Sequence, residues 1–280
     1  MAENFTQDNL SLTISTPLGQ NKLLLTGVRG EEHLSGLFHF TLDLFSEDGD
    51  LGFESIVGHS ATVVFVLPSG ATRYFNGIIG RFVQAGRHAR FTTYYADLHP
   101  WLWLLTMTRD CRIFQNQSVP DIIEAVFKDL GHTDYKNELK STYATREYCV
   151  QYQESVFDFV SRLMEDEGIF YFFKHEDGKH TLILADDADV HTDCADPATV
   201  EWGTAFPDRQ GDAIIINCTY AQQVIPNTYA MDDFNFETPD TDLLVTTQGR
   251  NGQRRIYDYP GGGCQARCRR KKGQPAPRRL

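Results

Sequence analysis

The sequence predicts a mainly β fold that is interrupted by a mixed α/β region, and three observations lead to this prediction. Short strand-like segments separated by turns fill the first hundred residues. A dense apolar block and two helical patterns follow, and strand-like segments return after residue 212. The composition agrees, because 19 Phe, 12 Tyr and 22 Gly in 280 residues suit many short strands and turns.

Alternating apolar residues mark the strands of the first region. Over residues 37–44, the side chains that point to one face are all apolar: Phe38, Phe40, Leu42 and Leu44. Such period-two alternation is typical of a strand with one buried face. Further strands are expected at residues 23–25, 61–67, 71–75, 77–83 and 90–98, with turns at Gly27 to Gly30 and at Pro68-Ser69-Gly70. This spacing favours an antiparallel barrel or a sandwich.

Two amphipathic helices are predicted in the middle region. Ser118 fits the N-cap of the first helix, with Asp121 three residues later, and Gly131 fits the residue that ends it. The second helix is expected over residues 155–167. The apolar block that precedes both helices, residues 100–105, is interpreted as a core plug where two subdomains meet rather than as a ligand pocket.

A β-hairpin and a second β region complete the pattern. Asp177-Gly178 is a strong turn signal between the expected strands 169–173 and 181–185. Residues 186–212 are polar and irregular, which indicates a loop or a domain boundary. Strands are expected again at residues 213–220, 222–225, 231–239 and 243–247.

Charge and targeting signals restrict the classes of partner. The net charge is −12, although the last 20 residues hold seven Lys or Arg and no acid. An acidic body argues against general binding to nucleic acid, and the basic end is interpreted as a solvated appendage. No secretory signal and no apolar run of about 18 residues is present, so we expect synthesis in the cytoplasm with the six cysteines as thiols.

Local motifs give no indication of an enzyme. The sequence contains no phosphate-binding loop, no Gly-x-Ser-x-Gly elbow and no His-Glu-x-x-His. A small hydrolase remains an alternative, because catalytic groups can meet only in the folded chain.

Two acidic clusters lie near histidines. Glu165-Asp166-Glu167 with His175 offers carboxylates and an imidazole for acid–base chemistry, but a helix end and a hairpin favour solvated surface. The second cluster could hold a metal but lacks the glycine and terminal Glu of a calcium loop, so a solvated acidic loop is favoured. Its members are Asp186, Asp187, Asp189, His191, Asp193 and Cys194.

The remaining candidates involve cysteines. Arg109-Asp110-Cys111-Arg112 is interpreted as an ion-paired strand rim, because a nucleophilic Cys111 would need a base that the sequence does not place. Cys264 and Cys268 have no second pair of ligands nearby and make a poor zinc site. The sequence therefore assigns no catalytic, cofactor-binding or metal-binding residue.

Several sequence segments of six to eight residues point to a known family. Their order and spacing resemble the VgrG family, the tip proteins of the bacterial type VI secretion apparatus, from about Leu23 to Gly261. The segments are Pro100-Trp101-Leu102-Trp103-Leu104-Leu105, Arg109-Asp110-Cys111-Arg112-Ile113-Phe114-Gln115, Ser118-Val119-Pro120-Asp121-Ile122-Ile123, Arg146-Glu147-Tyr148-Cys149-Val150-Gln151-Tyr152, Asp158-Phe159-Val160-Ser161-Arg162-Leu163-Met164-Glu165, Glu167-Gly168-Ile169-Phe170-Tyr171-Phe172-Phe173 and Asp233-Phe234-Asn235-Phe236-Glu237-Thr238-Pro239.

The resemblance implies two antiparallel β-barrel domains of the phage tail hub type with a mixed α/β region between them. The expected divisions are a first barrel at 1–98, the mixed region at 99–212, part of the second barrel at 213–260 and a disordered basic tail at 261–280. It also implies a structural role without a cofactor. Three chains form a homotrimer that caps the hexameric Hcp tube, carries the puncturing spike and meets effector or adaptor proteins. Full-length relatives are exported through the type VI apparatus without a signal peptide.

The chain departs from the family pattern after Gly261. Family members continue into a helix-rich link, an OB-like module and a β-helical needle, whereas this sequence ends 19 residues later. We therefore expect a truncated or frameshifted gene product that cannot enter a membrane alone. A non-functional remnant and a standalone β-barrel that binds a ligand are the alternatives.

Overall fold

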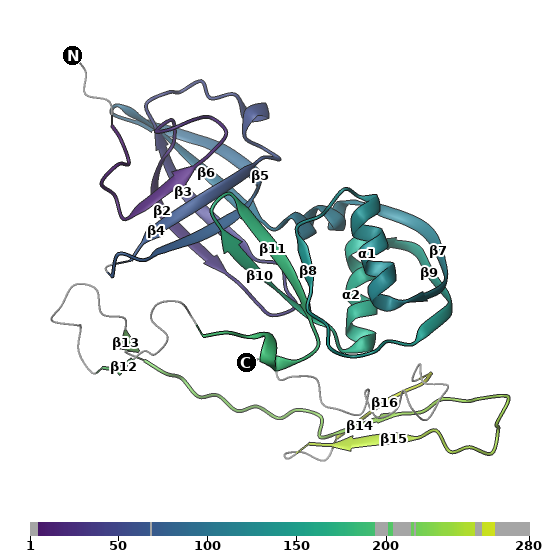
Figure 1. Cartoon of the computed structure of the whole chain (residues 1–280). Helices are drawn as coiled ribbons and strands as arrows, with labels where there is room; N and C mark the ends of the chain where they lie inside the picture. Colours follow the sequence, from purple (N-terminus) through teal and green to yellow (C-terminus); the bar gives the residue numbers. More distant parts are fainter. Residues whose placement is uncertain are drawn as a thin grey trace. The chain divides into compact units, whose positions relative to one another are not determined.

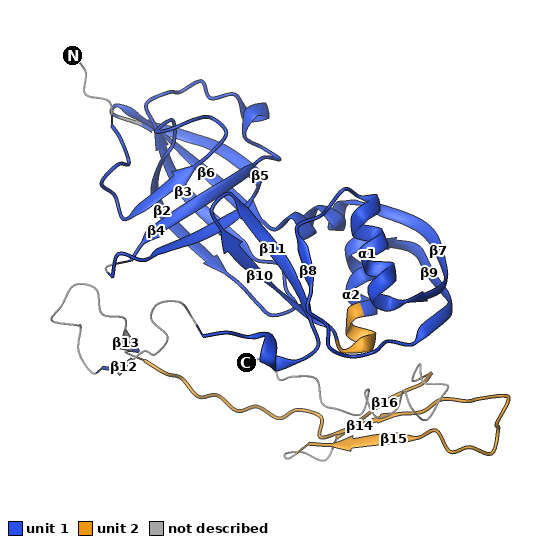
Figure 2. Cartoon of the chain, viewed as in Figure 1, with its two compact units in different colours: residues 1–163, 169–216 blue, residues 164–168, 217–280 orange. Residues whose placement is uncertain are grey.

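The computed structural model describes residues 5–67, 69–193, 201–203, 214–215, 217–249 and 254–260. The chain divides into two compact units (Figure 2). The larger unit comprises residues 1–163 and 169–216, and the smaller comprises residues 164–168 and 217–280. Among the described residues, no helix is long and apolar enough to cross a membrane.

A six-stranded sheet curls on itself in the N-terminal part of the larger unit (Figure 1). All neighbouring strands in this sheet are antiparallel, as the sequence predicts. Their order is β1 (Leu12–Ser15), β4 (Ser60–Val66), β5 (Thr72–His88), β6 (Phe91–His99), β3 (His39–Ser46) and β2 (Leu24–Glu31). A 3₁₀ turn, Phe53–Ser55, lies between β3 and β4.

The barrel core consists of the apolar faces of these strands. The alternation predicted around residue 40 is confirmed, because Phe40, Leu42 and Leu44 are buried while their neighbours reach the other face. Val63, Ile79, Tyr94 and Leu98 are fully buried in the same cluster. Each such side chain contributes about 1.5–3 kcal/mol relative to an exposed one, so the core accounts for the closure of the sheet.

Two details of the barrel differ from the sequence prediction. The turn expected at Gly27 to Gly30 is wrong, because β2 continues through both glycines with a bulge after Leu25. Gly30 is needed there for packing, since a Cβ at this position would clash with the Phe40 ring. The two strands expected at residues 71–83 are one long strand, β5, which bends at two bulges instead of breaking.

The two edge strands of the sheet meet through one glutamine. Gln7 is 7% exposed, and its side-chain oxygen accepts the N–H groups of Ile14 in β1 and Leu25 in β2, at 3.0 and 3.3 Å. Its amide donates to the Ile14 carbonyl at 3.2 Å. One side chain therefore replaces the missing ladder between β1 and β2 and closes this end of the barrel.

A mixed α/β layer follows the barrel in the larger unit. Helix α1 (Val119–Asp129) and the two-stranded sheet of β7 (Arg109–Ser118) and β9 (Thr145–Ser155) form its outer part, and α2 (Val156–Glu167) follows β9 directly. The capping box predicted at Ser118 and Asp121 is confirmed. The expected core plug is confirmed as a 3₁₀ segment, Trp101–Met107, with Trp101, Leu102 and Leu105 buried.

The predicted hairpin forms strands β10 (Phe170–Glu176) and β11 (Lys179–Ala185). A short parallel strand, β8 (Tyr135–Asn137), joins β11 on its other side. A 3₁₀ turn, Ala188–Val190, and the two-residue strands β12 (Glu201–Trp202) and β13 (Ile214–Ile215) lie within the stretch expected to be irregular or just after it.

The smaller unit contains a three-stranded sheet with β14 (Thr228–Met231) at its centre. Strand β15 (Val245–Gln248) is antiparallel to β14, and β16 (Arg255–Asp258) is parallel to it. The strand expected at 243–247 is confirmed as β15. Of the strand expected at 213–220, Ile214–Ile215 form β13 and 217–220 are irregular. The strand expected at 222–225 is wrong, and of the one expected at 231–239 Met231 alone lies in a strand. The basic tail, residues 261–280, lies outside the described residues.

The barrel closure yields a first prediction. Replacing Gln7 with alanine leaves the Ile14 and Leu25 amides without their buried acceptor, so we expect a loss of about 2 kcal/mol in the free energy of unfolding. Urea denaturation followed by fluorescence measures this loss. Gln20→Ala, at a surface glutamine that contacts Asp8 at 3.5 Å, is the control and should change stability by less than about 0.5 kcal/mol. Equal midpoints for the two variants would contradict the role of Gln7.

Candidate functional site

The junction between the barrel and the β10–β11 hairpin contains a buried polar network. We call it the junction network and define it by Asn76, His175, His180, Glu32 and the backbone of Trp101. Its members come from five parts of the chain, one of which is Trp101 at the start of the 3₁₀ segment. Asn76 lies on β5, His175 on β10 and His180 on β11, while Glu32 follows β2. Buried polar groups at such a density require mutual pairing, which fixes their geometry.

Asn76 is the centre of the junction network. Its side chain is 1% exposed, and its amide nitrogen donates to Ser60 Oγ at 2.9 Å and to Thr62 Oγ1 at 2.8 Å on β4. The same nitrogen lies 3.2 Å from the Ala61 carbonyl. Its oxygen accepts the Nδ1 proton of His180 at 2.7 Å. The carboxamide therefore joins two barrel strands to the hairpin with every polar group paired.

His180 is held as a neutral imidazole. Its Nε2 accepts the backbone N–H of Trp101 at 2.8 Å, so Nδ1 carries the proton that Asn76 accepts. Burial, followed by the nearby His175, lowers the pKa of His180 to about 4, while Asp134 acts in the opposite direction. The ring therefore connects the barrel, the core plug and the hairpin only in its uncharged form.

His175 lies in the junction network and not on solvated surface, so that expectation is wrong. Its side chain is 7% exposed. Nδ1 lies 3.1 Å from the Asn76 backbone N–H, and Nε2 lies 2.9 Å from Glu32 Oε1. Its ring contacts Phe38, Phe40 and Phe75. Its partners are these residues and not the Glu165-Asp166-Glu167 run, because the hairpin lies against the barrel.

The second acidic cluster is neutralised by a neighbouring loop. Asp186 accepts the N–H groups of Lys140 and Ser141, both at 2.8 Å. Burial opposes ionisation of Asp186, but these hydrogen bonds together lower its pKa. The Lys140 ammonium lies 3.7 Å from Asp187 and 3.3 Å from Asp189. Hydrogen bonds and ion pairs therefore connect the acidic loop at residues 186–189 to the loop that contains Lys140 and Ser141.

Other members of the acidic cluster do not converge on it. His191 stacks on Phe170 and lies near Phe172. Cys194 lies outside the described residues, as do Cys264 and Cys268. Over the described part of the chain, no three His, Cys, Asp or Glu side chains form a group that could hold a metal ion.

The charged residues 109–112 at the start of β7 form the expected ion-paired rim of this strand. Arg112 lies 2.8 Å from Asp110 and 3.7 Å from Asp129 at the end of α1. The Arg112 hydrogen bond, followed by the Cys111 backbone N–H, lowers the pKa of Asp110. Cys111 itself is exposed on the strand.

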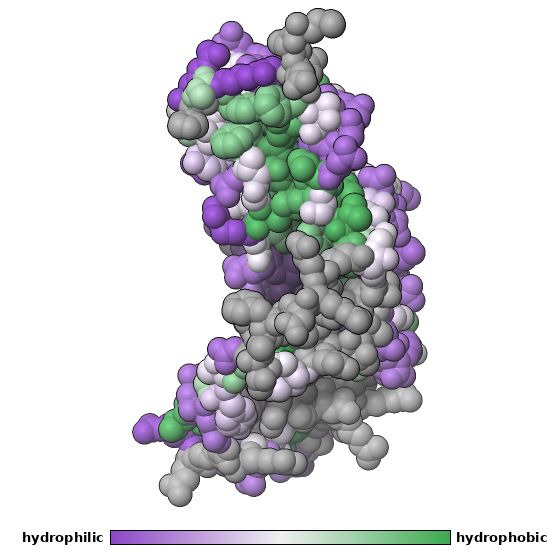
Figure 3. Space-filling view, turned by 90° about the vertical axis from the view of Figure 1, so that its left-hand side faces the viewer, coloured by the Kyte–Doolittle hydropathy of each residue, from purple (hydrophilic) through white to green (hydrophobic). Residues whose placement is uncertain are grey.

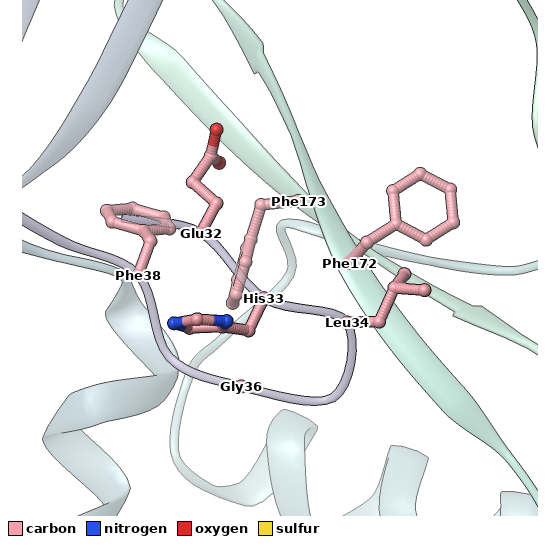
Figure 4. A pocket seen from close by; sticks show the side chains of 7 residues that line it. All are labelled: Glu32, His33, Leu34, Gly36, Phe38, Phe172 and Phe173. Atoms are coloured by element: carbon pink, nitrogen blue, oxygen red, sulfur yellow. The ribbon is translucent and has the colours of Figure 1, made fainter. Parts of the chain in front are cut away.

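Two open hollows of about 250 Å³ each lie beside the segment that follows β2. The first is lined by Glu32, His33, Leu34, Gly36, Phe38, Phe172 and Phe173, and Figure 4 shows these side chains. The second is lined by Val28, Gly30, Glu31, Glu32, Phe40 and Phe75. Both are smaller than the roughly 300–1,000 Å³ of small-molecule sites, and the Glu32 carboxylate already binds His175. Neither hollow favours a standalone ligand-binding barrel.

Large apolar side chains remain exposed in the smaller unit. We call them the C-terminal apolar surface. Its members are Tyr220, Val224, Ile225, Tyr229, Phe234, Phe236, Leu244, Ile256, Tyr257 and Tyr259. Tyr220, Val224 and Phe236 are more than 80% exposed, whereas Ala230 and Leu243 are the buried apolar residues that the structure describes in residues 217–260. Tyr229, Ile256 and Tyr257 lie on strands of the three-stranded sheet, and exposed apolar side chains that gather in one region often mark an interaction surface.

Comparison with protein families decides the identity of the fold. The model of the phage tail baseplate hub (GPD) family matches residues 31–279. The chain belongs to this family. The resemblance to VgrG proteins is also confirmed: this chain is 40% identical over 261 residues to the type VI secretion system spike protein VgrG1c of Pseudomonas aeruginosa. This alignment covers 92% of the chain and 36% of the relative.

Solved structures agree with the family assignment. This chain matches the E. coli c3393 protein, described as a type VI secretion component with structural similarity to T4 bacteriophage tail proteins gp27 and gp5. The match has a TM-score of 0.54 at 29% identity and covers 60% of this chain and 50% of the other. A Neisseria meningitidis MC58 tail protein shares the fold with a TM-score of 0.57 at 12% identity, covering 94% and 74% of the two chains. The predicted mainly β fold of the phage tail hub type is therefore confirmed.

This chain spans between 35% and 39% of the length of three curated Pseudomonas aeruginosa VgrG proteins.

The junction network yields a second prediction. Asn76→Ala removes the acceptor of His180 and the donor to Ser60 and Thr62, so we expect a loss of about 3 kcal/mol in the free energy of unfolding. Chemical denaturation of the variant and the parent protein measures it. The control is Asn137→Ala, at an exposed asparagine bonded to Glu124, which should cost less than about 1 kcal/mol. A similar loss in both variants would rule out a special role for Asn76.

The His180 environment yields a third prediction, on pH. Because the pKa of His180 falls from 6.5 to about 4 on folding, the unfolded chain binds more protons between these values. The stabilising contribution is present above pH 6.5 and is lost as the pH falls toward 4, by about 3 kcal/mol in total. Unfolding free energies measured from pH 7.5 to pH 4 test this. His180→Gln should flatten the curve over this range, whereas His59→Gln, at an exposed histidine, should leave the slope unchanged.

Proposed function

We propose that this chain is a structural hub component of a type VI secretion tip complex. The observation that carries the proposal is the family match over residues 31–279 together with 40% identity to a named VgrG spike protein. The proposed assembly is a homotrimer that caps an Hcp tube and carries a puncturing spike. No catalytic step is assigned to the chain, because its polar clusters serve as structural links between segments.

Symmetry gives the proposed assembly a physical basis. A hexameric tube presents six equivalent contacts, and three chains with two barrels each present six similar ones. We propose the first barrel at residues 1–98, the mixed region at 99–212 and part of the second barrel at 213–260. The second barrel then completes a ring in which unlike domains alternate.

The C-terminal apolar surface supports this assignment. Ten exposed large apolar side chains on one short segment exceed what a monomer normally presents to water. We propose that contacts within the assembled hub cover them. Burial of such a surface supplies the free energy of association, because apolar area removed from water contributes about 25 cal/mol per Å².

Partners and location follow as further proposals from the relatives. Effector or adaptor proteins are the expected additional partners, and the chain is expected to be made in the cytoplasm. Export through the type VI apparatus is proposed by analogy with the longer VgrG proteins.

The assembly proposal yields a fourth prediction. Light scattering of the purified chain should give a mass near three times 31.8 kDa, either alone or on addition of Hcp. Phe236→Lys, at a residue 81% exposed on the C-terminal apolar surface, should lower this mass without changing far-ultraviolet circular dichroism. Tyr152→Lys, at a residue 68% exposed on β9, is the control and should leave assembly intact. A strict monomer that ignores Hcp would contradict the hub proposal and favour a non-functional remnant.

A further inference from the structure

The six-stranded sheet has two edge strands, β1 and β2, and the longer of them, β2, has a stretch of free edge in the part of the chain that the structure describes. Strand β2 ends the sheet order and pairs only with β3. Gln7 covers its edge at Leu25, before the bulge. Beyond the bulge, the described residues give residues 28–31 no backbone hydrogen bond outside the β2–β3 ladder. In an antiparallel pair every second residue directs its N–H and C=O outward, so this edge keeps groups that can pair with another strand.

The free edge is open to solvent. Arg29, Gly30 and Glu31 are all exposed, and the exposed segment continues to Ser35. Figure 3 shows apolar side chains gathered on one face of the barrel, between hydrophilic margins.

A hollow lies directly beside this edge. Val28 and Gly30 of β2 line it together with Phe40 and Phe75 from β3 and β5. Val28 and Gly30 are two residues apart, so they share one face of β2. The absence of a side chain at Gly30 allows the Phe40 ring to lie over the strand and form the floor of the hollow. A strand added at the edge would direct its alternate side chains toward this apolar hollow.

The charges along the edge of β2 indicate the kind of segment that would fit there. Arg29 on the opposite face of β2 is paired with Asp43 at 3.4 Å, so its charge is compensated. The Glu31 carboxylate is 73% exposed, and among the described residues its ion-pair contact is the His33 ring, at 3.6 Å. The chain as a whole carries a net charge of −12. Cross-strand neighbours of opposite charge stabilise a sheet, so a basic residue fits beside Glu31.

We propose that the edge of β2 at residues 28–31 is a docking site for an extended, basic segment of another protein, which adds a strand to the barrel. The added strand places an apolar residue in the hollow lined by Val28, Phe40 and Phe75, and it places Lys or Arg beside Glu31. Main-chain hydrogen bonds supply affinity, while the hollow and the carboxylate supply specificity. This site is separate from the C-terminal apolar surface and does not depend on trimer formation.

The probe for this fifth prediction is a fluorescein-labelled peptide, Thr-Lys-Val-Thr-Phe-Thr-Val-Lys-Thr, titrated against the full chain by fluorescence anisotropy. We expect saturable binding, weakened about tenfold when both Lys are replaced by Glu. A version N-methylated at alternate backbone nitrogens should lose binding by a similar factor, because it cannot donate to the ladder. Hydrogen–deuterium exchange should slow on peptide binding at amides of residues 28–31.

Two variants test the site itself. Val28→Lys puts a charge into the hollow and should weaken binding at least about tenfold, with Val66→Lys at a 40% exposed residue of β4 as the matched control. Glu31→Lys changes only an exposed side chain and should reverse the preference, so that the Glu-flanked peptide binds better than the Lys-flanked one. Circular dichroism and thermal melting confirm that each variant is folded.

Several results would overturn the proposal. These are no saturation up to about 1 mM peptide, unchanged binding to Val28→Lys, or slowed exchange away from residues 28–31. Self-association of the parent chain that Val28→Lys abolishes would also overturn it, because a second copy would then occupy the edge. Failure of the hub proposal would appear separately, as a missing trimer or a missing response to Hcp.

Discussion

The larger unit depends on one constraint, which is that a buried carboxamide must have all its polar groups paired. Asn76 meets this condition only when β4 lies beside β5 and the hairpin presents the Nδ1 proton of His180. Any shift of the hairpin leaves a donor or an acceptor buried without a partner, which costs about 1–3 kcal/mol for each group. Hydrophobic contacts around Phe38 hold the hairpin and barrel together without direction, whereas the carboxamide selects a single arrangement.

Much of the fold could be predicted from local signals. The alternation around Phe40, the capping box at Ser118 and the Asp177-Gly178 turn each depend on a few neighbouring residues, and all three were predicted from them. Strand β9 is not predicted, and of β7 only the charged start at residues 109–112 is expected to lie on a strand, because these sequences show no clean alternation and their pairing joins residues far apart in the chain. The burial of His175 could not be predicted either, since its partners Glu32 and Asn76 lie about a hundred residues or more away.

The sequence segments that carry the family resemblance make specific contacts in the structure. Arg162, in one such segment, binds the Glu154 carboxylate at 2.7–3.1 Å and donates to the Val150 carbonyl at 2.7 Å. These contacts attach α2 to β9. Ser155 and Asp158 form a reciprocal bond at the start of α2, similar to the pair at Ser118. Polar links of this kind explain why apolar periodicity alone could not account for the charged and polar residues in these segments. They join elements rather than define a buried face.

The short connection between β6 and the core plug has a mechanical consequence. Pro100 is the only residue between His99, where β6 ends, and Trp101, where the 3₁₀ segment begins. The chain returns to the barrel about 75 residues later through the hairpin, whose Gly178 N–H donates to Thr62 at 3.2 Å. One covalent connection at Pro100 and several hydrogen bonds, from Gly178 to Thr62 and from Asn76 to His175 and His180, restrict rotation between the barrel and the mixed layer more than a single linker would. A force applied to helix α1 would therefore reach the barrel by two routes, through the main chain at Pro100 and through the hairpin.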